Sequence, residues 1–307
     1  MKSIFVDCSG ELVPLFERVR RPDDPEIVLN GEAAEPRALP RLLAGYAICL
    51  DDHSYLPTEA MRQCPELKHI VFLGTGASSY MDVSALQSLG ITVHTIKGYG
   101  DTAVAEHTIA LMFASCREIA RMDRAVRRGM WAPHESMQLR GKTLGLIGLG
   151  GIGREVARIA VGIGMRVIAW NRTPRSDAGV TLTGLDDLLG RADIVSLHLA
   201  LNEETRGLLD ARRMARLKRG AILINTARAD LVEEGALLEA LRAGHIRHAA
   251  LDVFHTEPLA TDHPLVQMEN VTLTTHAAFR TVEASETLMR RAIEIVKSII
   301  SPAVSQG

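Results

Sequence analysis

The sequence predicts an α/β protein with two doubly wound parallel sheets. Short aliphatic runs alternate with helical patterns, these elements fall into two series, and a length of 307 residues suits about two domains. Strands that alternate with helices form βαβ units, whose right-handed crossovers produce parallel sheets. The aromatic content of 4% fits the aliphatic core of such sheets.

The first series of elements ends before residue 100. Its expected strands are the runs Ile4–Val6, Ile27–Leu29, Ala47–Leu50, His69–Leu73 and Thr92–Ile96. The helices expected between them, Pro57–Cys64 and Val83–Leu89, are each followed by a turn residue, Pro65 or Gly90. These elements predict a first parallel sheet.

The second series follows a long helical pattern. Thr102–Gly129 has apolar residues at helical spacing, so we expect one helix that connects the two series. The strands expected after it are Thr143–Ile147, Arg166–Trp170, Ile194–His198, Ala221–Asn225, Ala249–Val253 and Val271–Thr274. The helices expected between those strands are Gly151–Ile163, Leu185–Leu189, Asp210–Leu217 and Glu233–Ala243.

The last helical pattern decides the domain organisation. We expect Val282–Ile300 to pack on the N-terminal domain, which makes the middle of the chain an inserted domain. The predicted domains are residues 1–100 plus 280–307 and residues 101–279.

Composition and charge argue against several kinds of partner. Lys and Arg total 35 and Asp and Glu total 37, so a net charge of −2 gives no broad attraction to nucleic acid or to a membrane surface. No apolar stretch predicts a transmembrane helix, and the N-terminal apolar run is too short for a secretory signal. The 4 cysteines lack CxxC spacing, and no His/Cys/Asp/Glu set has zinc-ligand spacing. We therefore expect a cytoplasmic protein without a metal site.

A glycine-rich segment, Gly148-Leu149-Gly150-Gly151-Ile152-Gly153, carries a dinucleotide-binding pattern. It follows an expected strand and opens an expected helix, which is the context that the motif requires. Gly148 permits a tight turn, Gly150 leaves room for a pyrophosphate, and Gly153 lets helix and strand pack closely. The helix N-terminus presents unpaired N–H groups to the phosphates. We interpret the inserted domain as a Rossmann-like nucleotide-binding domain, the alternative being a glycine-rich turn without a ligand.

The end of the next strand indicates which dinucleotide is preferred. An NAD-specific site commonly has a carboxylate about 20 residues beyond the glycines. Asn171 stands there instead, followed by Arg172 and Thr173, which can offer a cationic fork and a hydroxyl to a 2′-phosphate. We expect NADP(H) to be preferred, with NAD(H) possible. The alternative is that Arg172 and Arg175 are solvated loop charges.

Three later segments each follow an expected strand. They read Ile-Asn-Thr-Ala-Arg-Ala-Asp-Leu-Val (224–232), Ala-Leu-Asp-Val-Phe-His-Thr-Glu-Pro (250–258) and Thr-Thr-His-Ala-Ala-Phe (274–279). With the glycine segment, Gly74-Thr-Gly76 and Val104-Ala-Glu-His107, this ordered set resembles the D-isomer-specific 2-hydroxyacid dehydrogenase family, in its glyoxylate/hydroxypyruvate reductase-like form. The resemblance covers almost the whole chain. It implies an NAD(P)-dependent enzyme with a substrate domain and a nucleotide-binding domain, acting on a small 2-oxo or 2-hydroxy acid.

The resemblance also implies three catalytic residues: Arg228 binds substrate, His276 is the acid/base, and Glu257 is its carboxylate partner. Hydride reduction of a ketone leaves an alkoxide, so a proton donor must be adjacent, and His changes charge near neutral pH. A carboxylate favours the imidazolium form and fixes the ring. Arg228 can bind the substrate carboxylate and stabilise developing charge. The alternatives are that Arg228 is a solvated loop charge, that Glu257 is a turn residue, and that His276 is an ordinary surface or core histidine.

Further residues follow from the same resemblance. Thr75 and Gly76 are expected to hold the substrate carboxylate, and Asp252 to contact the nicotinamide carboxamide. His107 is expected to support the start of the long helix. Backbone groups expected to line the cofactor belong to Leu199, Ala200, Thr226 and Ala227.

The chain departs from the family pattern around the pocket. Thr275 replaces the usual proline, Ala229 replaces a glycine, and Ala277-Ala-Phe279 replaces a glycine-rich stretch, so the particular acid stays open. The leading hypothesis is an NADP(H)-dependent 2-ketoacid reductase. The alternatives are an NAD-dependent phosphoglycerate-type dehydrogenase, a formate dehydrogenase, or a non-catalytic nucleotide-sensing corepressor-like protein. Family members with the long helical arm are usually dimers, so we expect a homodimer.

Overall fold

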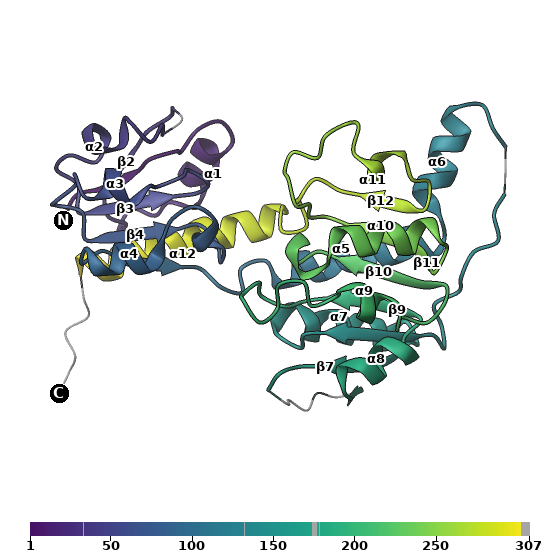
Figure 1. Cartoon of the computed structure of the whole chain (residues 1–307). Helices are drawn as coiled ribbons and strands as arrows, with labels where there is room; N and C mark the ends of the chain where they lie inside the picture. The colour runs from purple at the N-terminus through teal and green to yellow at the C-terminus, as the bar shows by residue number, and fades with distance from the viewer. Residues whose placement is uncertain (33, 132, 174–176, 178, 302–307) are drawn as a thin grey trace. The chain divides into compact units, whose positions relative to one another are not determined.

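The computed structural model describes residues 1–32, 34–131, 133–173, 177 and 179–301. The chain divides into two compact units (Figure 1). Unit 1 contains Met1–Gly100 and the segment that starts at Thr281, and unit 2 is the inserted segment Asp101–Arg280. Each unit is built on a parallel sheet, so the predicted α/β class is confirmed.

Unit 1 contains a five-stranded parallel sheet in the order β2-β1-β3-β4-β5. The strands are β1 (Ser3–Phe5), β2 (Ile27–Leu29), β3 (Ile48–Asp51), β4 (His69–Phe72) and β5 (Thr92–Thr95). One face is covered by α1 (Leu12–Val19) and α12 (Val282–Ile300). The other face is covered by α2 (Leu39–Leu42), α3 (Thr58–Met61), η1 (Ala77–Ser79) and α4 (Val83–Ser88).

The closing helix α12 completes the core of unit 1. Its residues Leu288, Met289, Ala292, Ile293 and Val296 recur at helical spacing and are buried against the sheet and α1. At the N-terminus of α12 the Thr281 hydroxyl accepts a hydrogen bond from the Ala284 amide, an N-cap. The expectation that this helix returns to the N-terminal segment is confirmed.

Unit 2 contains a seven-stranded parallel sheet in the order β12-β11-β10-β9-β6-β7-β8. The strands are β6 (Thr143–Ile147), β7 (Arg166–Trp170), β8 (Val180–Leu182), β9 (Ile194–Leu197), β10 (Ala221–Asn225), β11 (Ile246–Leu251) and β12 (Val271–Leu273). One face packs against α5 (Asp101–Cys116) and α7 (Gly151–Gly162). The other packs against α8 (Leu185–Arg191), α9 (Ala211–Met214), α10 (Glu234–Arg242) and α11 (Pro264–Gln267).

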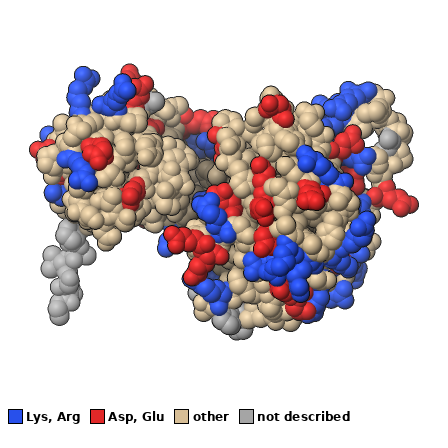
Figure 2. All heavy atoms as spheres, viewed as in Figure 1, with Lys and Arg blue, Asp and Glu red and all other residues tan. Residues whose placement is uncertain are grey.

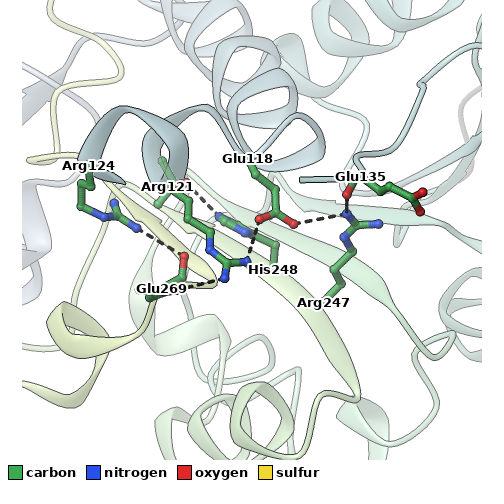
Figure 3. A network of polar contacts seen from close by, with 8 residues as sticks. Glu118, Arg121, Arg124, Glu135, Arg247, His248 and Glu269 are labelled. Atoms are coloured by element: carbon green, nitrogen blue, oxygen red, sulfur yellow. Dashed lines mark hydrogen bonds and ion pairs between the residues drawn. The ribbon is translucent and has the colours of Figure 1, made fainter. Parts of the chain in front are cut away.

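The prediction of one helix over Thr102–Gly129 is wrong. Helix α5 ends at Cys116, and α6 (Ile119–Arg127) starts after Glu118, whose backbone is left-handed at φ 54°. The Glu118 carboxylate accepts hydrogen bonds from Arg121 Nη1 at 3.1 Å and Arg247 Nη2 at 3.2 Å (Figure 3). These two charge-assisted contacts hold the break, since left-handed backbone is unfavourable for a residue other than glycine.

The charged surface is mixed. On the face of each unit visible in Figure 2, Lys and Arg side chains stand among Asp and Glu side chains. Among the described residues, no helix has the length and apolarity needed to cross a membrane. Within that same part of the chain, no group of three or more His, Cys, Asp or Glu side chains is arranged to hold a metal ion.

Candidate active site

The predicted site residues of unit 2 lie in loops at one edge of its sheet. Because the seven strands are parallel, their carboxyl ends meet at the same edge, where open α/β sheets bind ligands. These loops carry Gly148–Gly153 after β6, Asn171–Thr173 after β7, Leu199 and Ala200 after β9, Thr226–Arg228 after β10, Asp252 and Glu257 after β11, and His276 after β12.

The glycines of the loop after β6 meet different needs. Gly148 has φ +105°, and a Cβ there would stand 2.4 Å from the backbone oxygen of His198. A Cβ at Gly153 would stand 2.2 Å from the oxygen of Gly148. Both positions therefore need glycine for the turn and for close packing of α7 on the sheet.

The space above the loop can accept a phosphate. A Cβ at Gly150 would meet nothing within 4 Å, so this glycine leaves open space rather than filling a packed one. Gly150 is the N-cap of α7 and offers no capping side chain, so the first amides of the helix stay available to an anion. The residues present fit the pyrophosphate of a dinucleotide.

Asp101 lies beside this helix start, a feature that the sequence interpretation missed. A Cβ at Gly151 would fall 1.8 Å from Asp101 Oδ2, so the carboxylate lies directly against that glycine. Asp101 is the first residue of α5, about 50 positions earlier in the chain, and no local pattern connects the two.

The loop after β7 is attached to the glycine loop. Asn171 Oδ1 accepts a hydrogen bond from the Leu149 amide at 3.1 Å, and its Nδ2 donates to the oxygen of Thr173 at 2.5 Å. Arg172 pairs with Glu204 at 2.7 Å, and both side chains are largely exposed. Glu204 belongs to the loop after β9, so the cation proposed for a 2′-phosphate has an anionic neighbour. Arg175 lies outside the described residues.

The loop that carries Arg228 is fixed by a buried amide. Asn225, at the end of β10, donates through Nδ2 to the oxygen of Arg228 at 2.9 Å and accepts through Oδ1 from the Ala227 amide at 3.0 Å. The guanidinium of Arg228 is half-buried and donates to the oxygen of Ala227 at 2.7 Å. In the same loop, Thr226 Oγ1 lies 2.9 Å from Thr108 Oγ1 of α5.

His276 and Glu257 form a hydrogen-bonded pair. His276 Nδ1 lies 2.8 Å from Glu257 Oε2, and Oε1 of the same carboxylate accepts from the Phe254 amide at 2.9 Å. A carboxylate only accepts hydrogen bonds, so Nδ1 of His276 is the donor in this contact and Nε2 is the ring nitrogen left to face a ligand. The His276 side chain is 39% exposed, so the ring is accessible to a ligand.

Asp252 is completely buried, and its carboxylate holds the backbone next to His276. Its Oδ1 accepts from the Ala277 amide and its Oδ2 from the Ala278 amide, both at 3.0 Å. Thr274 Oγ1 lies 2.5 Å from Oδ1. The carboxylate therefore serves this loop; its expected contact with a nicotinamide carboxamide stays a prediction.

His198 lies beneath the glycine loop at the end of β9. Its oxygen is the atom that excludes a side chain at Gly148, and its Nε2 lies 2.9 Å from Ser196 Oγ. Burial lowers the pKa of His198 to about 4. A neutral imidazole at this position completes the packing under the loop.

Thr75 and Gly76 belong to unit 1. They follow β4, and the Gly76 oxygen accepts from the Ser79 amide at 3.0 Å, which starts η1. At the same edge, Asp7 accepts hydrogen bonds from the amides of Asp52, His53 and Ser54. The sequence interpretation did not include this carboxylate, because its partners follow a different strand.

Comparison with known proteins agrees with this architecture. Residues 109–278 match the family model of the D-isomer specific 2-hydroxyacid dehydrogenase NAD-binding domain. The chain is 37% identical over 308 residues to a glyoxylate reductase of Aeropyrum pernix, covering 96% of this chain and 87% of that protein. It is 37% identical over 244 residues to a D-3-phosphoglycerate dehydrogenase of Archaeoglobus fulgidus, covering 78% of this chain and 46% of that protein.

A solved structure is similar to almost the whole chain. The structure of an acyclic imino acid reductase (Bsp5) in complex with NADPH and D-Arg has a TM-score of 0.87 and 30% identity, covering 98% of this chain and 97% of that one. The range 109–278 matched by the family model spans the glycine loop, Arg228, Glu257 and His276. The chain therefore belongs to the D-isomer specific 2-hydroxyacid dehydrogenase family and is an oxidoreductase with a nicotinamide nucleotide cofactor.

Proposed function

We propose that this protein is an NADPH-dependent reductase of small 2-oxo acids of the glyoxylate and hydroxypyruvate type. The observation that carries the proposal is the hydrogen-bonded pair of His276 and Glu257 at the sheet edge that also holds the glycine loop. The similarity to a glyoxylate reductase supports the substrate class. The absence of a carboxylate at Asn171 and the cation at Arg172 support the phosphorylated cofactor.

The roles of the residues follow from their chemistry. The bound dinucleotide supplies the hydride. His276 Nε2 gives a proton to the oxygen that becomes the hydroxyl, while Glu257 holds Nδ1 and stabilises the protonated ring. Arg228 binds the substrate carboxylate and stabilises the negative charge that develops on the carbonyl oxygen. We further assign Thr75 and Gly76 to the substrate carboxylate.

The reaction is tested by following NADPH absorbance with glyoxylate, hydroxypyruvate, pyruvate and bulkier 2-oxo acids. We expect turnover of the small acids, and we expect His276→Ala to lower kcat by roughly two orders of magnitude or more while NADPH binding persists. Arg228→Ala should raise KM and lower kcat together, because it acts on bound substrate and on the transition state. A His276→Ala variant with normal turnover would remove the proposed acid/base.

Two other outcomes are informative. Turnover of 3-phosphoglycerate with NAD and none of the small acids would favour the phosphoglycerate alternative. Cofactor binding without turnover of any acid would favour a nucleotide-sensing protein of the same fold.

We also propose that the protein forms a homodimer through α6 and the residues around it. None of the residues of α6 is buried, and large apolar side chains are exposed on and next to it: Phe113, Ile119, Val126, Met130 and Trp131. An unburied apolar surface of this kind is typical of a protein–protein contact. Sedimentation velocity should give a dimer, and a monomer at every concentration would contradict the proposal.

A further inference from the structure

His276 has an unusual backbone conformation. Its φ is +52°, in the left-handed region that residues other than glycine rarely adopt. Such a conformation persists only where the surroundings determine it. The contacts of the neighbouring residues therefore decide where the imidazole stands.

Those contacts converge on one buried carboxylate. Asp252 accepts from the amides of Ala277 and Ala278, the two residues that follow His276. Asp252 also accepts from the hydroxyl of Thr274, two residues before His276. The carboxylate thus holds the chain on both sides of the strained residue.

The Thr274 hydroxyl extends this contact to helix α5. A hydroxyl has a single proton, and Thr274 gives it to Asp252, so its oxygen can only accept from His107 Nε2 at 3.0 Å. His107 Nε2 also lies 3.6 Å from Asp252 Oδ1. The direction of donation is therefore His107 to Thr274 to Asp252, with the proton of His107 on Nε2.

The neighbouring position on α5 contacts the other catalytic loop. Thr108 Oγ1 donates to the Val104 oxygen at 2.8 Å, so at the 2.9 Å contact it accepts from Thr226 Oγ1. Two consecutive residues of α5 thus reach the loop of His276 and the loop of Arg228. His107 lies in the second turn of the helix, so the expectation that it supports the helix start does not describe its contacts.

We propose that His107 and Thr274 are positioning residues that fix the left-handed backbone of His276 through Asp252. The inference rests on the proposed acid–base role of His276. Without the donor at residue 107, Thr274 loses the contact that directs its hydroxyl toward Asp252, and the loop becomes free to relax. The imidazole then moves away from the geometry that proton transfer requires.

The experiment compares His107→Leu and Thr274→Val, which remove the contact, with His107→Gln, which keeps an N–H donor near the position of Nε2. Thr272→Val is the matched control, because Thr272 Oγ1 makes the same kind of contact with His248 Nε2 at 2.9 Å and has no link to Asp252. All variants are measured for kcat and KM with glyoxylate, for the Kd of NADPH, and for amide exchange of residues 274–280 without ligand.

We expect His107→Leu and Thr274→Val to lower kcat about ten-fold or more, with the Kd of NADPH changed less than about two-fold. The solvent isotope effect on kcat should rise, because proton transfer from a displaced ring becomes slower. The Ala277 and Ala278 amides should exchange faster. His107→Gln should recover most of both losses, and Thr272→Val should show neither.

Two results would overturn the inference: wild-type exchange and kcat in His107→Leu, or a His107→Gln variant as defective as His107→Leu. If no 2-oxo acid is reduced even by the wild-type protein, the proposed function fails. The amide exchange then still decides whether His107 and Thr274 hold the loop.

Discussion

Single glycines in the loop after β6 have separable roles. Positions 148 and 153 need glycine because nearby backbone atoms leave no room for a Cβ at Gly148 or Gly153. Gly150 faces open space, so its lack of a side chain matters only if a ligand approaches. This difference makes Gly150 a direct test of cofactor binding.

We predict that Gly150→Ala folds normally but binds NADPH at least about ten-fold more weakly, because the methyl group takes the space of the pyrophosphate. The free energy of unfolding should fall by no more than about 1 kcal/mol, because alanine can adopt the Gly150 φ of −79°. Gly162→Ala in the same helix, which also meets nothing within 4 Å, is the control and should keep normal binding. Unchanged NADPH fluorescence titration of Gly150→Ala would place the phosphates elsewhere.

The ion pair between Arg172 and Glu204 bears on the choice of cofactor. If Arg172 binds a 2′-phosphate, it must either break its ion pair with Glu204 or contact both anions at once. In the second case the Glu204 carboxylate repels the phosphate. Exposed ion pairs contribute only about 0.2–1 kcal/mol, so the effect on specificity is modest but measurable.

Glu204→Gln should therefore raise kcat/KM for NADPH about two- to five-fold and leave the value for NADH nearly unchanged. Glu203→Gln removes the same charge from the preceding exposed residue and serves as the control. When Arg172→Ala is also present, Glu204→Gln should no longer raise kcat/KM for NADPH. A gain that persists there would show that Glu204 does not act through Arg172.

Elements whose signals are local agree with the sequence interpretation, and elements fixed by distant contacts do not. Strands β2, β6, β7 and β10 have the bounds that their aliphatic runs predict, and α12 begins and ends as expected. The edge strand β8 has only 3 residues and no apolar run. The sequence interpretation did not include the helices α1, α2 and α11, of which α2 and α11 have only 4 residues each.

The break between α5 and α6 shows why distant contacts defeat a sequence pattern. The apolar spacing continues through Glu118, but the carboxylate of this left-handed residue pairs with Arg247, 129 positions later in the chain, and no local pattern predicts that contact. The candidate active site likewise contains contacts that no local sequence pattern predicts. Motifs located the glycine loop, Arg228, Glu257 and His276, whereas the contacts of Asn225, Thr108 and Thr274 depend on which loops the sheet brings together.

At this break, we predict a measurable loss of stability in Glu118→Gln. Burial raises the pKa of Glu118, but hydrogen bonds from Arg121 and Arg247 outweigh it and the pKa is lowered. Removing the charge should cost about 1–3 kcal/mol of unfolding free energy, measured in urea. Asp123→Asn removes a carboxylate from an exposed pair with Arg127 and should have little effect. Equal effects of the two changes would mean that the Glu118 network is an ordinary surface contact.

For the molecule as a whole, the two segments of unit 1 are joined by a buried ion pair. Arg290 of α12 donates to both oxygens of Asp24 at 2.5 and 2.7 Å, and the Asp24 side chain is only 1% exposed. Hydrogen bonding from Arg290 lowers the pKa of Asp24 from 3.8 to about 2. A carboxyl group with a lowered pKa stabilises the folded state above its unfolded pKa, and that stability is lost as the pH falls.

Unit 1 should thus lose stability as the pH falls from about 4 toward 2, and Asp24→Asn should reduce that dependence, the remainder coming from Asp23 and Asp82, whose pKa values are also lowered. At neutral pH the substitution should cost about 3 kcal/mol, because it removes the bidentate anion from a largely buried guanidinium that keeps only Glu294 at 3.3 Å and the Val19 oxygen. The neighbouring Asp23→Asn affects an exposed pair with Lys297 and should change little. Urea titrations followed at several pH values measure both effects, and an unaltered acid dependence in Asp24→Asn would assign it to other carboxylates.

The placement of α12 has a consequence for biosynthesis. A ribosome makes the five strands of unit 1 first, then all of unit 2, and only afterwards the helix that covers one face of the first sheet. Until α12 emerges, Phe5, Phe16 and Val71 lack their final neighbours, while unit 2 already has every strand it needs. The nascent chain should therefore complete its second unit before its first, leaving an apolar sheet face for a chaperone to shield in the interval.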